Sequence, residues 1–326
     1  MNTTSIISSP FQLFSFSELI KQKNINNYFL IVLIYNEFEL IQIKNLASSL
    51  DVKIHKTIIG QKVFQYFLIR KLIRKLKNID IVIIGNFFSD PHLVFVNEIK
   101  NTKIIVLDDG LNSNFILNSL GKKNYPIFKL LFIILFKFNL DFPKNFSIFT
   151  MFDLKSNNRN IIIEKNQLLN TKQKIENFSH KDFTLIIGQP FVELSILNRN
   201  FYVSLIDKLN KQFPNLVYIP SRKENDTTLN SMRQNININI LRTDINIEHY
   251  LLQNKIIPKT ILGFTSTALV SIDKIFNKAQ VNIDIKSVRL SEKSIKENRP
   301  KLGMNYSFYK HYKLLDDFKI KSLKNV

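Results

Sequence analysis

The chain has 326 residues, which is long for a single core and sufficient for two domains of about 150 residues each. Hydrophobic residues make up 45 % of it, which excludes an intrinsically disordered chain, and the absence of cysteine excludes disulfides, thiolate metal sites and cysteine nucleophiles. A formal net charge of +20 indicates a polyanionic partner: nucleic acid, anionic lipid or an anionic substrate.

Short apolar segments of strand length alternate with helix-length segments in the first half of the chain. The predicted strands are 4–8, 29–35, 53–58, 79–84 and 103–107, and the predicted helices are 12–23, 37–50, 61–77 and 93–100. Near-continuous Ile, Val and Leu strands between amphipathic helices are typical of a parallel sheet that is covered on both faces. The pattern therefore predicts a doubly wound α/β domain.

Two polar stretches, 153–160 and 166–181, separate this pattern from a second one. Its predicted strands are 183–187, 216–219, 238–241, 260–262 and 281–285, and its predicted helices are 199–213, 248–254 and 266–276. We therefore predict an α/β protein of the GT-B type, with two doubly wound Rossmann-like domains that face a central cleft. The domains are expected to comprise residues 1–155 and 156–326, the second ending in a C-terminal helix.

Two basic stretches, 62–77 and 122–137, suit an anionic membrane surface because their cations are combined with apolar or aromatic residues. For 62–77 an ordinary surface helix that packs its apolar side on the sheet is an equal alternative. No uncharged apolar run reaches the roughly 18 residues that span a bilayer, and the first residues lack the pattern of a signal peptide. We expect a cytoplasmic protein, soluble or peripheral on the membrane.

Functional residues of open α/β sheets follow the carboxyl ends of strands. Asp108 and Asp109 occupy such a position, and one of them could act as a general base towards a sugar hydroxyl. The alternative is an ordinary turn, because Asp-Asp-Gly is a common turn sequence.

Three further loops follow strands in the second half of the chain. Gly188 permits close approach of the backbone to a ligand, and Arg222 and Lys223 could bind a phosphate with Glu224 orienting one of them. Residues 265–267 place three hydroxyls at a helix N-terminus, which favours an anion. The alternatives are a simple loop, a solvated charged loop and a helix cap without a ligand.

In this order the loops resemble glycosyltransferase family 52, whose best-known members are sialyltransferases of lipooligosaccharide and capsule synthesis. Residues 6–13 resemble the first strand and loop of the family, and 108–110 resemble an acidic motif shared by several bacterial sialyltransferase families. Residues 188–190, 246–248 and 263–269 resemble its donor-site segments. The resemblance extends from residue 7 to about residue 276.

The resemblance implies an inverting transfer of sialic acid from CMP-sialic acid to a terminal sugar hydroxyl of lipooligosaccharide or capsular glycan, without a metal or other cofactor. The first domain would be on the acceptor side, with Asp109 and Asp108 as its catalytic residues, and Asp109 would deprotonate the acceptor. The second domain would bind the nucleotide sugar, with Ser266 and Thr267 on the phosphate and Glu248 on the ribose. The implied donor-binding residues are Gly188, Gln189, Ser221, Arg222, Glu248, Thr265, Ser266 and Thr267.

Ser221 stands where the family carries a histidine. A serine hydroxyl can donate a hydrogen bond but carries no positive charge, so Arg222 or Lys223 would have to supply it. The alternatives are the same fold with another nucleotide-sugar donor, such as a UDP-hexose, and a non-catalytic relative that binds a glycan or nucleotide.

The expected partners are a lipid-linked glycan acceptor and an anionic membrane surface, at the inner face of the cytoplasmic membrane. The resemblance is also compatible with a homodimer. Nucleic acid ranks last among the polyanions, because the sequence contains no recognised binding motif and its basic segments are backed by apolar residues.

Overall fold

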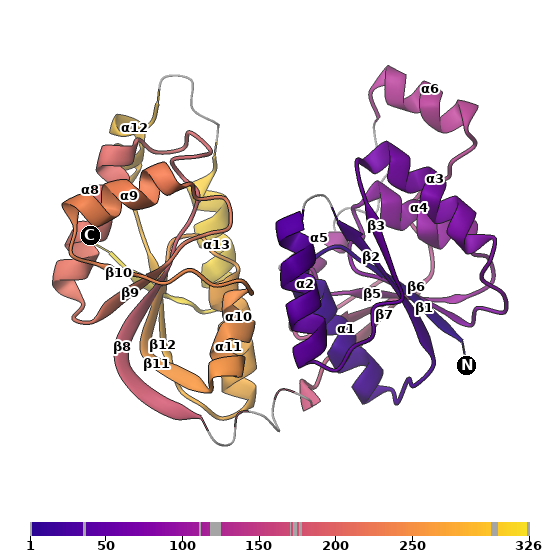
Figure 1. Ribbon diagram of the computed structural model, residues 1–326, viewed down its shortest axis with the longest axis horizontal. Coiled ribbons are helices and arrows are strands. Elements are labelled where there is room, and N and C mark those ends of the chain that lie inside the picture. The colour runs from indigo at the N-terminus through magenta and orange to yellow at the C-terminus, as the bar shows by residue number, and fades with distance from the viewer. Residues whose placement is uncertain are drawn as a thin grey trace. The chain divides into compact units, whose positions relative to one another are not determined.

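The structure is a computed structural model that describes residues 2–34, 37–110, 112–117, 125–169, 171, 175, 178–300 and 306–324. The chain divides into two compact units, Met1–Gln173 with Asp244–Asn246, and Lys174–Thr243 with Ile247–Val326. Each unit contains one parallel sheet with helices on both faces (Figure 1). The predicted α/β class with two doubly wound units is confirmed.

The first unit has a seven-stranded sheet in the order β3-β2-β1-β4-β5-β6-β7. Its strands are β1 (Thr3–Ile7), β2 (Tyr28–Ile34), β3 (Lys56–Ile59), β4 (Ile81–Ile84), β5 (Lys103–Leu107), β6 (Phe146–Thr150) and β7 (Ile161–Lys165). Its helices are α1 (Pro10–Gln22), α2 (Glu37–Ser49), α3 (Lys62–Ile73), α4 (Asp90–Glu98), α5 (Ser113–Ile116) and α6 (Ile127–Leu135). The winding direction reverses between β1 and β4, the topological switch point of a Rossmann-like sheet.

The first sheet continues past residue 155, where the sequence predicted the domain limit. β7 pairs with β6 over five residues, from Phe146 with Ile161 to Thr150 with Lys165. Neither strand was predicted, and β7 lies between the two polar stretches that were expected to separate the domains. It is a five-residue edge strand (IIIEK) between polar stretches. Only its first three residues are apolar, and Ile162 among them is 58 % exposed, so its apolar pattern is short.

The second unit has a six-stranded sheet in the order β10-β9-β8-β11-β12-β13. Its strands are β8 (Ser179–Ile187), β9 (Leu216–Ile219), β10 (Asn239–Ile240), β11 (Ile256–Gly263), β12 (Asp284–Val288) and β13 (Lys321–Leu323). Its helices are α8 (Arg199–Gln212), α9 (Asp226–Asn235), α10 (Ile247–Asn254), α11 (Ala268–Lys278), α12 (Glu292–Glu297) and α13 (Phe308–Asp317). The sheet repeats the switch point of the first, here between β8 and β11.

The central strands lie in the cores because helices cover both sides of each sheet. All five residues of β1 are buried, including Ser5, and the four residues of β4 are at most 2 % exposed. Burial on both faces explains why these strands read as continuous apolar runs rather than as alternating patterns. None of the helices in the described part of the chain is long and apolar enough to cross a bilayer.

Candidate active site

The buried aspartate at the end of β5 is a structural anchor. Asp108 is 0 % exposed, and its carboxylate accepts hydrogen bonds from the Ser113 hydroxyl at 2.6 Å and the Met151 N–H at 2.8 Å. Ser113 opens α5, and Met151 directly follows β6. The carboxylate therefore joins three segments of the first unit, and both of its oxygen atoms are engaged.

The neighbouring Asp109 is less buried and lies beside the start of α1. Its carboxylate accepts hydrogen bonds from the Ser9 hydroxyl at 3.5 Å and the Asn112 side-chain amide at 3.2 Å. Ser9 is the N-cap of α1, where its hydroxyl oxygen accepts the N–H of Gln12 at 3.3 Å. The two predicted catalytic carboxylates thus have separate environments, and Asp109 is the less buried of the two.

In the second unit a hydrogen-bonded cluster forms where parallel strands end. β8 pairs with both β9 and β11, so the loops that follow these strands meet at one edge of the sheet. The Gln189 side-chain oxygen accepts the backbone N–H of Thr265 at 2.8 Å and its hydroxyl at 2.7 Å. The Thr265 hydroxyl also lies 2.7 Å from that of Tyr306, and the Gln189 N–H donates to the Tyr202 hydroxyl at 3.1 Å.

A buried carboxyl group continues this cluster. The hydroxyls of Tyr202 and Tyr218 are 3.0 Å apart, and Tyr218 donates to Oε1 of Glu224. The Ser221 N–H donates to Oε2 of the same carboxyl at 2.5 Å. Burial raises the pKa of Glu224 to about 8, although both hydrogen bonds act in the opposite direction. Burial also raises the pKa values of Tyr202 and Tyr218 well above their usual 10.

Gly188 leaves the space that the buried carboxyl group occupies. A Cβ at this position would lie 2.4 Å from the Tyr218 hydroxyl oxygen and 2.5 Å from Oε2 of Glu224. Any larger residue would therefore displace the two groups that complete the cluster. The close approach expected at this glycine is made by side chains of the protein itself.

The loop after β9 places Ser221 in different surroundings from Arg222 and Lys223. The Glu224 N–H donates to the Ser221 carbonyl at 3.0 Å, while the Ser221 hydroxyl accepts the Lys223 N–H at 3.5 Å. This tight turn brings Ser221 to the cluster and leaves Arg222 and Lys223 exposed. The positive charges of the motif are thus on the surface, beside Ser221.

The three hydroxyls before α11 divide in the same way. Thr265 is 4 % exposed and belongs to the cluster. Ser266 is half-buried and its hydroxyl accepts the Ala268 N–H at 3.3 Å, whereas Thr267 is exposed. Thr265 is therefore held inside the cluster, whereas Ser266 and Thr267 lie at the start of the helix.

Glu248 lies in α10 and is 7 % exposed. It accepts a hydrogen bond from the hydroxyl of Ser271 in α11, which also donates to the Ala268 carbonyl at 3.1 Å. The carboxylate consequently connects α10 to the first turns of α11.

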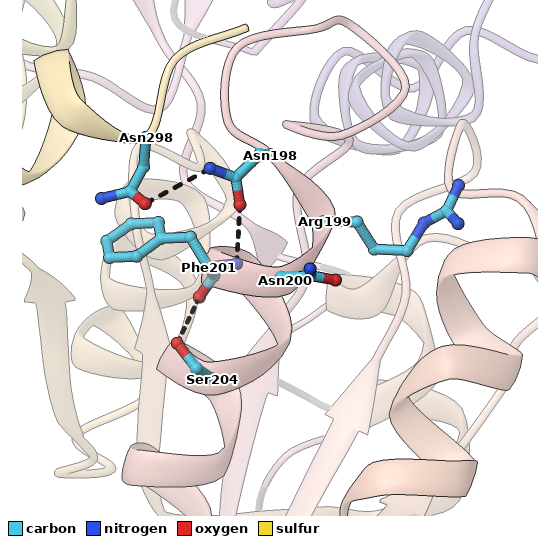
Figure 2. Close-up of a pocket in the computed structure, with 6 residues that line it drawn as sticks. All are labelled: Asn198, Arg199, Asn200, Phe201, Ser204 and Asn298. Carbon is cyan, nitrogen blue, oxygen red and sulfur yellow. Dashed lines mark hydrogen bonds between the residues drawn. The ribbon is translucent and has the colours of Figure 1, made fainter.

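A pocket of about 660 Å³ lies at the N-terminus of α8 and was not predicted (Figure 2). Asn198 caps this helix: its side-chain oxygen accepts the Phe201 N–H at 2.8 Å, and its amide donates to the Asn298 side chain at 3.3 Å. α8 is the first helix after Gln189, and the pocket lining includes none of the cluster residues. Its lining residues are Asn198, Arg199, Asn200, Phe201, Ser204 and Asn298.

Three tyrosines of the cluster were also missed. Tyr218 offers a signal, because a buried tyrosine inside an aliphatic strand needs a hydrogen-bond partner for its hydroxyl. Tyr202 and Tyr306 offer no such signal, because neither lies in an apolar strand: Tyr202 is in α8 and Tyr306 is in the segment before α13. Among the residues that the structure describes, no group of three or more His, Asp or Glu side chains could hold a metal ion.

Two Rossmann-type sheets in one chain define the fold class, and solved structures agree. MnaA of S. aureus in complex with UDP has a TM-score of 0.57 at 13 % identity, covering 98 % of this chain and 88 % of that one. UDP-GlcNAc 2-epimerase from Neisseria meningitidis bound to UDP-GlcNAc has a TM-score of 0.55 at 12 % identity, and the match covers 98 % of this chain and 92 % of that one. Arabidopsis thaliana UGT89C1 complexed with UDP-L-rhamnose has a TM-score of 0.53 at 10 % identity, and the match covers 99 % of this chain and 85 % of that one. These likenesses show the fold, which is of the GT-B type.

A family profile described as alpha-2,8-polysialyltransferase (POLYST) matches residues 5–284. The chain belongs to this family and is a glycosyltransferase, which confirms the resemblance to sialyltransferases. No curated protein matches the chain significantly.

We predict that Gly188→Ala destabilises the second unit by about 1–3 kcal/mol, because the added methyl group forces Tyr218 and Glu224 apart. Denaturant unfolding measures the effect. Gly263→Ala is the matched control, since the nearest atom to its Cβ would be a Leu269 side-chain carbon at 3.2 Å. Equal stabilities of the two variants would contradict this role of Gly188.

The raised pKa of Glu224 predicts a pH dependence of stability. The carboxyl is protonated in both states below about pH 4.5, and the folded state keeps its proton up to about pH 8. The free energy of unfolding therefore falls as the pH rises from 4.5 to 8, by at most about 1.4 kcal/mol per unit, and Glu224→Gln lacks this contribution. Urea unfolding between pH 4.5 and 8 measures the difference in the free energy of unfolding between wild type and Glu224→Gln. Glu292→Gln, at an exposed position, is the control. A difference that does not change with pH would refute the raised pKa of Glu224.

Proposed function

We propose that the protein is an inverting sialyltransferase that uses CMP-sialic acid and a terminal sugar hydroxyl of lipooligosaccharide or capsular glycan. The family match over residues 5–284 is the observation that carries the proposal. The family description also names an α2,8 linkage, so the terminal acceptor sugar is proposed to be a sialic acid. We place the lipid-linked acceptor at the cytoplasmic face of the inner membrane.

The proposed reaction is a single displacement. The acceptor oxygen forms a bond to the anomeric carbon of sialic acid while the bond from that carbon to the phosphate oxygen of CMP breaks. The acceptor proton passes to the carboxylate of Asp109, and negative charge grows on the departing phosphate. Asp108, with both oxygens engaged inside the protein, holds the loop that carries the base. The proposed step uses no metal ion or other cofactor.

The second unit is proposed to hold the donor. Ser266 and Thr267, at the start of α11, would bind the phosphate through their hydroxyls and the helix N-terminus. Glu248 would accept a ribose hydroxyl. Arg222 would supply the positive charge that Ser221 lacks, because its side chain is exposed beside Ser221. Gly188, Gln189 and Thr265 support this surface through the buried cluster.

The nucleotide specificity distinguishes this donor from its alternative. Three similar structures contain UDP or a UDP-sugar, which together with Ser221 makes a UDP-hexose the second candidate. We predict that CMP raises the melting temperature more than UDP or GDP, with a gain of about 2.7 kcal/mol at 100 times its dissociation constant. A thermal-shift titration with the three nucleotides measures this. A larger shift with UDP would indicate a UDP-sugar donor in place of CMP-sialic acid. No shift with any of the three nucleotides would favour a non-catalytic relative.

Two isosteric substitutions separate the neighbouring aspartates. We predict that Asp109→Asn lowers the rate of sialic acid transfer by about 10²–10⁴-fold and changes stability less than Asp108→Asn does, because Asp109 is only partly buried and its hydrogen bonds are longer, at 3.5 and 3.2 Å. Asp108→Asn instead lowers the free energy of unfolding by about 1–3 kcal/mol, because an amide cannot accept both of its hydrogen bonds. Initial rates with sialylated and unsialylated acceptors, and denaturant unfolding, measure the two effects. A wild-type rate in Asp109→Asn would exclude it as the base.

A further inference from the structure

Helix α6 exposes nearly all of its apolar side chains. Eight of its nine residues are apolar (IFKLLFIIL) and none is buried. Ile127 is 73 %, Phe128 is 87 % and Leu135 is 74 % exposed. An ordinary surface helix presents polar residues on its outer side, so this composition indicates a face that contacts something other than water.

One side of α6 is fixed to α3, and the other side faces outward (Figure 1). The ring centroid of Phe67 in α3 lies 6.1 Å from that of Phe132 and 5.0 Å from that of Phe136. The Arg70 guanidinium donates to the Phe136 carbonyl at 2.7 Å and lies 4.0 Å from the centre of the Phe138 ring. The outward side is therefore held in a defined position on the unit.

The exposed apolar face continues onto α3. Val63 is 51 %, Phe64 is 57 % and Phe67 is 38 % exposed, and all three lie in the first half of that helix. We call these residues, together with the exposed apolar residues of α6, the α3–α6 surface. It combines two helices of one unit and involves no residue of the cluster in the other.

The charge around this surface is mainly positive. Residues 52–79 contain eight Lys and Arg and no Asp or Glu, and residues 110–140 contain four Lys and no Asp or Glu. The cations Lys71, Arg74 and Lys75 are exposed at the end of α3. Three carboxylates lie nearby. Asp90 pairs with Lys129 and Glu98 with Arg70, while the exposed Asp141 acts through its charge on Tyr125, just before α6. An apolar face bordered by uncompensated cations is complementary to anionic lipid.

We propose that the α3–α6 surface docks on an anionic lipid bilayer. α6 is about 14 Å long, which suits a helix that lies in the membrane interface with its apolar side towards the acyl chains. The cations at the end of α3 then contact the headgroups. A second copy of the chain fits less well, because a two-fold contact would bring the same cations against one another.

The test is flotation of the full chain with vesicles, which needs neither donor nor acceptor and so stands apart from the proposed reaction. We predict binding to vesicles of phosphatidylcholine with phosphatidylglycerol, loss of binding in high salt, and little binding to phosphatidylcholine alone. Leu131→Gln with Ile134→Gln should weaken binding roughly tenfold or more, because both side chains face outward. Lys75→Gln should weaken it about fivefold, which corresponds to about 1 kcal/mol.

Matched variants control for general effects. Ile162→Gln removes an apolar side chain of similar exposure in the same unit, and Lys208→Gln removes an exposed cation of α8. Both should bind vesicles as wild type, and all variants should keep its melting temperature. Failure of wild type to float with anionic vesicles, or equal weakening by Ile162→Gln, would overturn the proposal. So would a concentration-dependent dimer that Leu131→Gln with Ile134→Gln abolishes, because a second copy would then cover the surface.

Discussion

The second unit is organised around a carboxyl group that has been removed from water. A buried carboxyl is costly unless hydrogen bonds surround it, and Glu224 obtains them from Tyr218 and from the Ser221 N–H. These contacts fix the turn after β9 and require a residue without a side chain at Gly188. Through Tyr202 the same chain of bonds reaches Gln189, so one buried group determines the positions of two strand-end loops.

The first unit contains a simpler form of the same arrangement. Asp108 is enclosed by hydrogen-bond donors from α5 and from the end of β6, and its neighbour Asp109 is left at the edge of the sheet. In both units an inward acidic side chain holds a loop, while residues beside it remain accessible. Adjacent polar residues in a strand-end motif therefore have different roles, which their order in the sequence does not distinguish.

The strand-end rule explains how much of this was predictable. Parallel pairing alone brings Gly188, Gln189, Ser221 and Thr265 to one edge, so their proximity follows from the apolar pattern of the strands. The ends of β5 and β9 were predicted from that pattern, whereas the short edge strand β7 and the polar helix α9 were not. The missed tyrosines depend on how α8 and the chain before α13 pack, and tertiary packing leaves no periodic signal.

The two basic segments show why amphipathic patterns need a structure to be interpreted. In α3 the predicted apolar side is used inside the protein, since Ile69 and Ile73 are buried against the sheet. In the described part of the chain, the aromatic contacts of α6 occupy one side of the helix, and its outward side is exposed. An exposed apolar face of this kind promotes aggregation unless like charges keep copies apart or a partner covers it. Among free molecules, the cations around α6 repel other copies of the chain and so oppose aggregation. At an anionic membrane surface, the same cations favour binding to the partner that covers the apolar face.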